Sequence, residues 1–376
     1  MRFFAYLQSL SFPRVLLKQF LAESRRHALL HVVSLSSLLL AAAIVRTTEL
    51  DFRFAIVARF IVVFCILAAS VLLLPLLVMK GLRCARGDDD APFVPEFLRR
   101  HVLAPERVAR LLHVMIAIAV LQIAYNVIKR AIPVFHPFAF DRQLAELDRW
   151  LHFGVDPYRL LMPVFGTPLA TYFLAYAYHF WFFLMPVFWA WQALSGKDRG
   201  MRFLLAFMLL WIVGSGGLGT LLSSVGPCYY ANLFPGDALF EPLMAKLREA
   251  SAVYPIAALS VQDMLWQGHV SGTGIVHGIS AMPSMHVGTS VLFALAAPRR
   301  TVLRKLLAVF AVVIFLGSIQ LGWHYAVDGY VAVLLAVLFW WIAAGLVRWD
   351  RRQWRSVPTT RLKVALSTPV VAHVDA

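Results

Sequence analysis

Residues 282–347 read MPSMHVGTSVLFALAAPRRTVLRKLLAVFAVVIFLGSIQLGWHYAVDGYVAVLLAVLFWWIAAGLV. Three apolar runs, at Ser284–Ala297, Val302–Leu321 and Gly329–Val347, are separated by short polar segments. A helix of roughly 20 apolar residues crosses the hydrocarbon core of a bilayer. The stretch therefore predicts three consecutive transmembrane helices. The first is short, so we expect protein rather than lipid to surround much of it.

Apolar runs of the same kind continue toward the N-terminus. They lie at Ala28–Val45, Phe54–Met79, Ala109–Ile128, Leu169–Leu194 and Phe203–Leu222. Of all 376 residues, 60% are hydrophobic and only 15% are charged, which leaves too little polar surface for a water-soluble protein of this size. We therefore predict an all-α polytopic membrane protein with about eight transmembrane helices.

The Lys and Arg residues predict how these helices are oriented. With the N-terminus inside, the cytoplasmic segments carry 25 of the 35 Lys and Arg residues and the outer segments carry 9. This is the asymmetry that the positive-inside rule describes, and it accounts for the net charge of +15 without a nucleic-acid partner. We predict an integral protein of the bacterial inner membrane or an equivalent membrane, with both termini cytoplasmic.

The predicted spans divide the chain into five parts. These are a cytoplasmic interfacial segment, two N-terminal transmembrane helices, a cytoplasmic linker, a six-helix core and a basic cytoplasmic tail, at residues 1–27, 28–79, 80–108, 109–347 and 348–376.

A long outer loop at 223–283 interrupts the predicted core. It contains two amphipathic stretches, one capped by Asp237 and running to about Ala250, the other at Ile256–Trp266. Loops of this length often form a lid or a binding surface. We therefore expect the loop to contribute to a site.

Two polar motifs stand at the outer ends of predicted spans. The first is Met282-Pro283-Ser284-Met285-His286, and the second is Leu321-Gly322-Trp323-His324-Tyr325-Ala326-Val327-Asp328. One inward and one outward crossing separate the motifs, so the predicted topology returns both to the same face of the membrane. That face is the outer one.

The residue types of the two motifs suit phosphoryl transfer. A histidine can attack phosphorus when one ring nitrogen is unprotonated, and a carboxylate on the other nitrogen enforces that state. Asp328 follows His324 by one helical turn and can take this part. His286 can protonate the departing alkoxide. Pro283 suits the first turn of a helix, where Ser284 and free amides would face phosphate oxygens.

These motifs resemble the type 2 phosphatidic acid phosphatase superfamily over roughly residues 109–347. The nearest branch in pattern is that of the inositol phosphorylceramide synthases, with Pro-Ser-Leu/Met-His and His-Tyr-x-x-Asp. Two upstream segments are similar as well: Gly226-Pro227-Cys228-Tyr229-Tyr230 and Asp148-Arg149-Trp150-Leu151-His152-Phe153-Gly154.

The resemblance implies a role for each motif residue. His324 would be the nucleophile that forms a phosphohistidine, Asp328 its partner and His286 the general acid. Substrate-binding positions would be Ser284, Gly226, Pro227, Tyr229, Tyr230 and Tyr325. No cofactor or metal is implied.

The chain departs from the phosphatases of that superfamily in its cations. It has no Lys-x6-Arg-Pro motif, and Gly317-Ser318 stands where they carry Ser-Arg. Because those cations clamp a doubly charged monoester, their absence favours a phosphodiester and the transfer of an inositol-phosphate-like head group from a phospholipid donor to a lipid alcohol. The outer loops can still supply charge, from Lys246, Arg248, Arg142 or Arg149.

Alternatives to this interpretation remain open. The protein can instead hydrolyse a lipid phosphate or polyprenyl diphosphate, or bind or transport lipids without catalysis. His179 is a candidate for helix packing or for catalysis, and His269 and His277 near His286 are a weak candidate zinc set without thiolate or carboxylate. The aromatic residues of Leu169–Leu194 line a lipid groove or form an interface belt.

Overall fold

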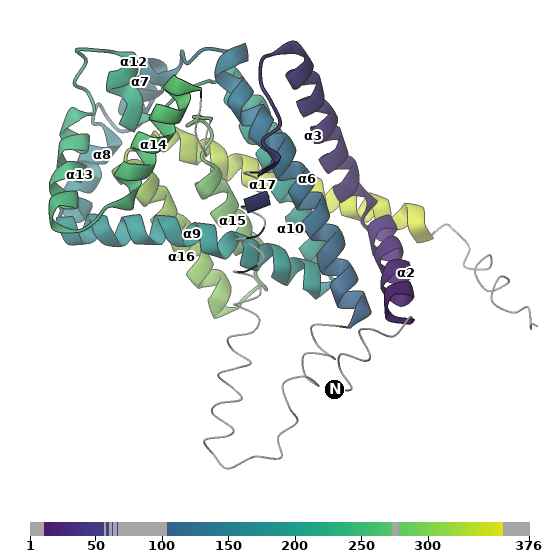
Figure 1. Ribbon diagram of the computed structural model, residues 1–376. Coiled ribbons are helices and arrows are strands. Elements are labelled where there is room, and N and C mark those ends of the chain that lie inside the picture. Colours follow the sequence, from purple (N-terminus) through teal and green to yellow (C-terminus); the bar gives the residue numbers. More distant parts are fainter. Residues whose placement is uncertain are drawn as a thin grey trace, which may run out of the picture.

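The computed structural model describes residues 11–55, 104–272 and 278–355, together with positions 58, 59, 62 and 66. Every regular element in these ranges is a helix (Figure 1). Six segments are long and apolar enough to span a membrane, namely Ala28–Thr47, Pro105–Phe135, Pro168–Ser195, Asp198–Leu221, Val302–Gln320 and Ala326–Arg352. The predicted class, an all-α multi-pass membrane protein, is confirmed.

The spanning segments carry the labels α3 (Ala28–Thr47), α6 (Pro105–Phe135), α9 (Pro168–Ser195), α10 (Asp198–Leu209) with its continuation, α16 (Val302–Gln320) and α17 (Ala326–Arg355). A seventh apolar helix, α15 (Met285–Ala296), is only 12 residues long and mostly buried, as expected for the short predicted span. The predicted second span, Phe54–Met79, lies outside the described residues apart from scattered positions.

The largest correction concerns the end of α6. The apolar run predicts a span from Ala109 to Ile128, but the helix begins at Pro105 and continues to Phe135. Two cations placed in an outer loop, Lys129 and Arg130, therefore stand on the helix. Arg130 is accommodated there because its guanidinium pairs with Asp51 at 3.0 Å.

The helix that follows α10 is unusual in its hydrogen bonding. A π-helix, η1 (Leu210–Leu218), continues α10 and passes into α11 (Gly219–Leu221). A glycine at the start of α11 permits a close contact, since a Cβ on Gly219 would lie 2.9 Å from the Met282 carbonyl oxygen. Such π-segments occur frequently at functional sites, and this one packs beside the first motif.

The N-terminal helices pack against α6. A short helix, α2 (Ser11–Arg26), leads into α3, which runs parallel to α6 (Figure 1). The Ser34 hydroxyl donates to the Ala117 carbonyl at 2.8 Å, and further along both helices Asp51 meets Arg130. These contacts attach the N-terminal pair to the rest of the helical bundle.

Six short helices gather at one end of the bundle, to the left in Figure 1. They are α7 (Asp141–Leu151), α8 (Pro157–Phe165), η2 (Pro227–Tyr229), α12 (Tyr230–Leu233), α13 (Glu241–Val253) and α14 (Ala257–Ser271). The sequence predicted only the last two. Asp237 does not cap α13, which begins four residues later; its Oδ1 instead accepts the Leu239 N–H at 3.2 Å.

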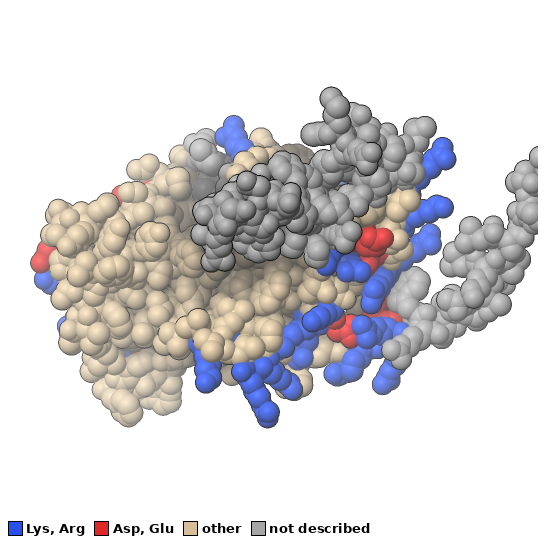
Figure 2. Space-filling model, turned by 90° about the horizontal axis from the view of Figure 1, so that it is seen from below, with Lys and Arg blue, Asp and Glu red and all other residues tan. Residues whose placement is uncertain are grey.

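Lys and Arg residues are distributed unevenly on the face shown in Figure 2. Most lie toward the end that carries α2 and the last turns of α17, to the right, while the opposite end is largely uncharged. Exposed apolar side chains cover the helices between, such as Leu39 on α3, Val309 on α16 and Leu334 on α17. This is the surface expected of a protein that faces lipid.

Candidate active site

A cavity of about 370 Å³ lies between α6, α9, η1, α14 and α15. Both motif histidines, His286 and His324, line it. The rest of the lining is mainly apolar and aromatic and includes Tyr125, Tyr178, Trp181, Phe182, Trp211, Met264, Leu265 and Trp323. Two imidazoles that are 38 positions apart in the chain therefore meet at one largely apolar pocket, which is the usual form of a small-molecule site.

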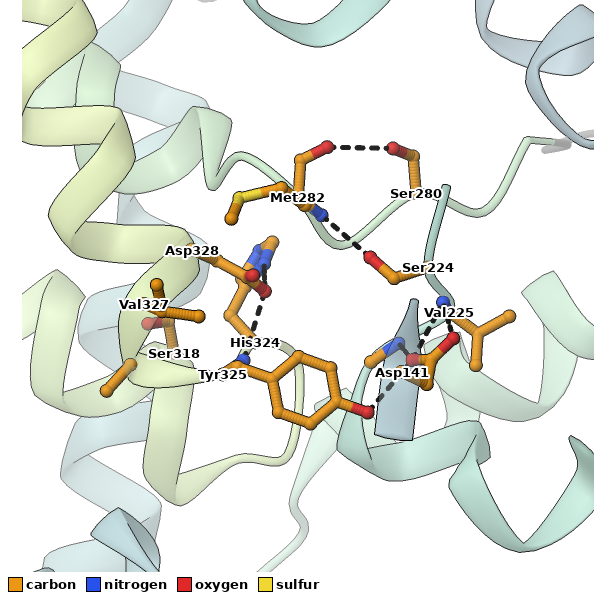
Figure 3. A network of polar contacts seen from close by, with 12 residues as sticks. Asp141, Ser224, Val225, Ser280, Met282, Ser318, His324, Tyr325, Val327 and Asp328 are labelled. Carbon is orange, nitrogen blue, oxygen red and sulfur yellow. Dashed lines mark hydrogen bonds and ion pairs between the residues drawn. The ribbon is translucent and has the colours of Figure 1, made fainter. Parts of the chain in front are cut away.

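His324 and Asp328 form a buried pair. The His324 Nδ1 and the Asp328 Oδ2 are 3.3 Å apart, and the side chain of Asp328 is fully buried. Since a carboxylate only accepts, Nδ1 carries the hydrogen, and the Nε2 lone pair of the neutral ring is left free for the cavity. The same Oδ2 accepts the Tyr325 N–H at 3.0 Å, which fixes the carboxylate (Figure 3).

The helix that carries Asp328 is capped from a distance. Asp148 on α7 accepts the Ala326 N–H at 2.6 Å and the Val327 N–H at 2.8 Å, which are free amides of the first turn of α17. A carboxylate at this position also complements the positive end of the helix dipole. Asp148 therefore holds the start of α17 in place, next to the His324–Asp328 pair.

This cap predicts a pH-dependent stability. Burial raises the pKa of Asp148 to about 7, above its ordinary value of 3.8. Between these pH values the folded protein retains a proton that the unfolded chain has lost, so this group's contribution to the free energy of unfolding falls as pH rises. Asp148→Asn removes this dependence of the free energy of unfolding on pH, because an amide does not titrate. It also leaves one acceptor oxygen for two backbone amides, which lowers the free energy of unfolding by about 1 kcal/mol.

Unfolding of the detergent-solubilised protein between pH 4 and 8 measures the effect. The difference in free energy of unfolding, wild type minus Asp148→Asn, is expected to be positive at pH 4 and to fall as pH approaches 7. A difference that stays constant or grows across this window would contradict the assigned cause.

A second carboxylate, Asp141, ties three segments together (Figure 3). It accepts the Val225 N–H at 3.0 Å, the Gly226 N–H at 2.9 Å and the Tyr325 hydroxyl at 2.9 Å. Burial raises its pKa to about 6. Gly226 has φ +93°, and a Cβ there would lie 2.5 Å from the Trp323 carbonyl oxygen, so only glycine allows this approach beside His324.

The first motif is attached to the second through its backbone. The Ser284 N–H donates to the Asp328 carbonyl at 3.2 Å. The predicted helix start needs correction: α15 begins at Met285 with Ser284 as its N-cap, so Pro283 stands before the helix. His286 in the first turn contacts three aromatic rings, those of Tyr178, Trp181 and Phe182, at centroid distances of 4.3, 4.2 and 5.3 Å.

Lys129 is the cation of the cavity. Of the Lys and Arg residues in the described part of the chain, it alone lines this space. No carboxylate within those residues lies at ion-pair distance from it. A half-buried ammonium without a counter-charge, on the same wall as two imidazoles, is a binding position for an anion.

A third histidine, His179, also lines the cavity. Its Nδ1 lies 2.7 Å from the Ala175 carbonyl oxygen, which can only accept, so Nδ1 carries the hydrogen. The Nε2 of the neutral ring is then an acceptor. The sequence analysis offered helix packing and catalysis as alternatives for His179. In the structure its ring bonds to its own helix through Nδ1 and also lines the cavity.

The remaining predicted site residues take different positions. Tyr229 lines the cavity and donates to the Gln262 carbonyl at 2.9 Å. Five others do not line this cavity: Ser284, Gly226, Pro227, Tyr230 and Tyr325. The Tyr230 hydroxyl donates to Asp237 at 3.2 Å, and the Ser284 hydroxyl is buried with no protein partner among the described residues.

The cations proposed from the outer loops are already paired. Arg149 meets Asp156 at 3.0 Å, Lys246 meets Glu249 at 2.6 Å and Arg142 approaches Asp237 at 4.0 Å, while Arg248 pairs with Glu241. The candidate zinc set does not assemble either within the described residues. His269 packs against Phe138 and Trp266, and His277 falls outside the described ranges.

The sequence reasoning missed Lys129, Asp141 and the capping function of Asp148. The signal for the two carboxylates was present, because they lie seven residues apart and share one face of an amphipathic helix with Leu144 and Ala145. Lys129 gave no comparable signal, since its position depends on how far α6 continues beyond the apolar run.

Comparison with known proteins agrees with this geometry. A family model of the PAP2 superfamily matches residues 142–342, more than half of the chain, and includes both motifs and α7 from its second residue onward. No curated protein and no solved structure matches the chain. The match confirms the superfamily and does not specify a branch within it. The chain therefore belongs to the PAP2 superfamily and is a helical membrane enzyme of the lipid phosphatase or phosphotransferase type.

Proposed function

We propose that this enzyme transfers a phosphorylated, inositol-phosphate-like head group from a phospholipid to a lipid alcohol through a phosphohistidine on His324. The proposal rests on one observation: two imidazoles and a single ammonium, His286, His324 and Lys129, line one largely apolar cavity. The imidazoles provide a nucleophile and a proton donor, and the ammonium provides a counter-charge for one anionic phosphate.

In the first step, the His324 Nε2 attacks phosphorus and forms a P–N bond. The bond from phosphorus to the lipid oxygen breaks, and protonated His286 gives its proton to the departing alkoxide. Asp328 stabilises the positive charge that develops on the His324 ring. The products are a lipid alcohol and the head-group phosphate on His324, so the step needs no external reagent.

In the second step, the acceptor lipid alcohol gives its proton to neutral His286. Its oxygen attacks phosphorus, the P–N bond breaks, and the electron pair returns to the His324 Nε2. The enzyme regains its starting protonation state. Apolar residues of α14 that line the cavity, Val261, Met264 and Leu265, suit the hydrocarbon part of a lipid acceptor.

The charge of the cavity supports a diester donor. A phosphate diester carries one negative charge and a monoester carries nearly two at neutral pH. Lys129 balances one charge, and the arginines of the outer loops are already paired with carboxylates. A doubly charged monoester would need the transferable proton of His286 as its second counter-charge, whereas a diester is balanced by Lys129 alone.

We also propose that the cavity opens at the outer side of the bacterial inner membrane and that both termini are cytoplasmic. The support is the distribution of charge, because Lys and Arg gather at the end of the molecule that carries α2 and the end of α17 (Figure 2). Labelling of single introduced cysteines in intact cells with a membrane-impermeant reagent tests this orientation. We expect Glu249→Cys to be labelled and Ser195→Cys to stay unlabelled.

A substrate comparison with purified protein tests the activity. Phosphatidylinositol with ceramide or diacylglycerol as acceptor is expected to give a new lipid that carries the head group, while phosphatidic acid is expected to release little inorganic phosphate. Mass spectrometry and a phosphate assay measure the two products. Rapid release of phosphate from phosphatidic acid, with no transfer product from the diester, would establish hydrolysis instead.

A further inference from the structure

A second cluster of ionisable side chains lies at the junction of α2 and α3, where these helices contact α6. It consists of Glu23 at the end of α2, His27 between the two helices, His31 on α3 and His113 on α6. The cluster is separate from the cavity of His286 and His324 and outside the range that matches the PAP2 family. Phosphoryl transfer gives it no role.

Three donor atoms of this cluster, from Glu23, His27 and His113, are close enough to share one ion. The His27 Nδ1 lies 3.2 Å from the His113 Nε2 and 3.6 Å from the Glu23 Oε2, and the three ligand atoms all lie within 4.8 Å of one another. Zinc bonds of 2.0–2.1 Å in tetrahedral geometry place neighbouring ligand atoms about 3.3 Å apart. Two of the observed separations, 3.2 and 3.6 Å, are near that value, and the third is within 4.8 Å.

Several polar atoms of the cluster are buried and lack a partner among the described residues. They are the Glu23 Oε2, the His31 Nε2 and the His113 Nδ1. Glu23 is 7% exposed and His113 is fully buried. Leaving such groups unsatisfied is costly, and a bound ion that takes the carboxylate oxygen and aligns the imidazoles relieves part of that cost.

A neighbouring arginine orients the carboxylate of the cluster. Arg110 donates to the other carboxylate oxygen of Glu23 at 2.8 Å, which leaves Oε2 directed to the histidines.

The sequence contains a helical pattern that matches this arrangement. Glu23, His27 and His31 follow one another at intervals of four residues across the junction of α2 and α3. His113 approaches from α6, and its ring centroid is 5.1 Å from that of His27 and 5.6 Å from that of His31. The junction therefore brings one carboxylate and three imidazoles together.

We propose that Glu23, His27 and His113 bind a Zn²⁺ ion, with His31 as the fourth ligand. Two or three imidazoles with one carboxylate suit zinc, whereas magnesium and calcium prefer oxygen ligands throughout. The ion connects α2 and α3 to α6 and so attaches the N-terminal helices to the catalytic bundle. Its contribution is to stability, because a ligand that binds only the folded state raises the free energy of unfolding.

Metal titration of the full-length protein in detergent tests this site. After treatment with EDTA and dialysis, ZnCl₂ is expected to bind at one ion per chain and to raise the melting temperature. Co²⁺ is expected to give the intense visible absorption of a tetrahedral complex. His27→Gln and His113→Gln are each expected to weaken Zn²⁺ binding more than about 100-fold, since even the loss of an outer-shell partner costs roughly 10–100-fold.

Two further variants keep the test independent of misfolding. His136→Gln removes a partly buried histidine at the far end of α6, outside the cluster, and is expected to bind Zn²⁺ as the wild type does. His27→Cys replaces one ligand type by another and is expected to retain tight binding. The proposal fails if the wild type binds no Zn²⁺ or Co²⁺ at micromolar concentration, or if His27→Gln and His113→Gln bind as tightly as His136→Gln.

Discussion

Replacing His324 by alanine is expected to abolish head-group transfer, with a loss of at least about 10³-fold in kcat, because loss of a nucleophile removes the covalent route altogether. Asp328→Asn is expected to reduce kcat strongly as well. An amide cannot hold the hydrogen on the His324 Nδ1 as a carboxylate does, so the ring loses the tautomer that presents Nε2 to phosphorus. The measurement is turnover of a labelled phospholipid donor by purified protein.

The matched control is His136→Ala, which removes a partly buried histidine outside the cavity and is expected to retain full turnover. Circular dichroism and size-exclusion chromatography establish that each variant remains folded. Turnover by folded His324→Ala within a few-fold of the wild type would exclude this residue as the nucleophile.

Replacing Lys129 by methionine is expected to produce the second large loss, of about 10²–10³-fold in kcat/KM. Methionine retains most of the side-chain volume, so the change removes the charge and little of the packing. Since Lys129 is the only Lys or Arg on the cavity wall within the described residues, no other permanent cation there can neutralise the phosphate in its place. Initial rates with the diester donor at several concentrations measure the loss.

Lys246→Met is the control for this substitution. That residue is exposed and paired with Glu249, so we expect kcat/KM to remain within about twofold of the wild type. Equal activity of Lys129→Met and Lys246→Met would show that the phosphate charge is met elsewhere, and the argument for a singly charged donor would lose its support.

The spans and the two motifs were predictable because they depend on local properties of the chain. Apolar length identifies the spanning helices, and the spacing of four residues predicts that His324 and Asp328 meet. The helical turn expected between them is wrong, because His324 precedes α17 and only Asp328 lies in its first turn. The convergence of His286 and His324 was predictable as well, since two crossings return the chain to one face of the bundle. The same reasoning identified 223–283 as a contributor, and α14 of that loop lines the cavity.

The supporting contacts depend on tertiary packing and were not predictable in the same way. Asp148 caps a helix that begins 178 positions later, and nothing in its local sequence names Ala326 as its partner. Lys129 was assigned to a loop because charged residues normally mark the end of a span. Packing with α3 and the pair of Arg130 with Asp51 extend α6 by nearly two turns and bring Lys129 to the cavity.

The most direct test of the mechanism is the isolation of the covalent intermediate. Wild-type protein is mixed briefly with phosphatidylinositol labelled with ³²P, denatured in alkali without acceptor lipid, and digested for mass spectrometry. The mechanism predicts an alkali-stable, acid-labile phosphoryl adduct on His324 that disappears when the acceptor lipid is added before quenching. A wild-type enzyme that forms product while His324 carries no adduct, or that carries it on another residue, would contradict the mechanism.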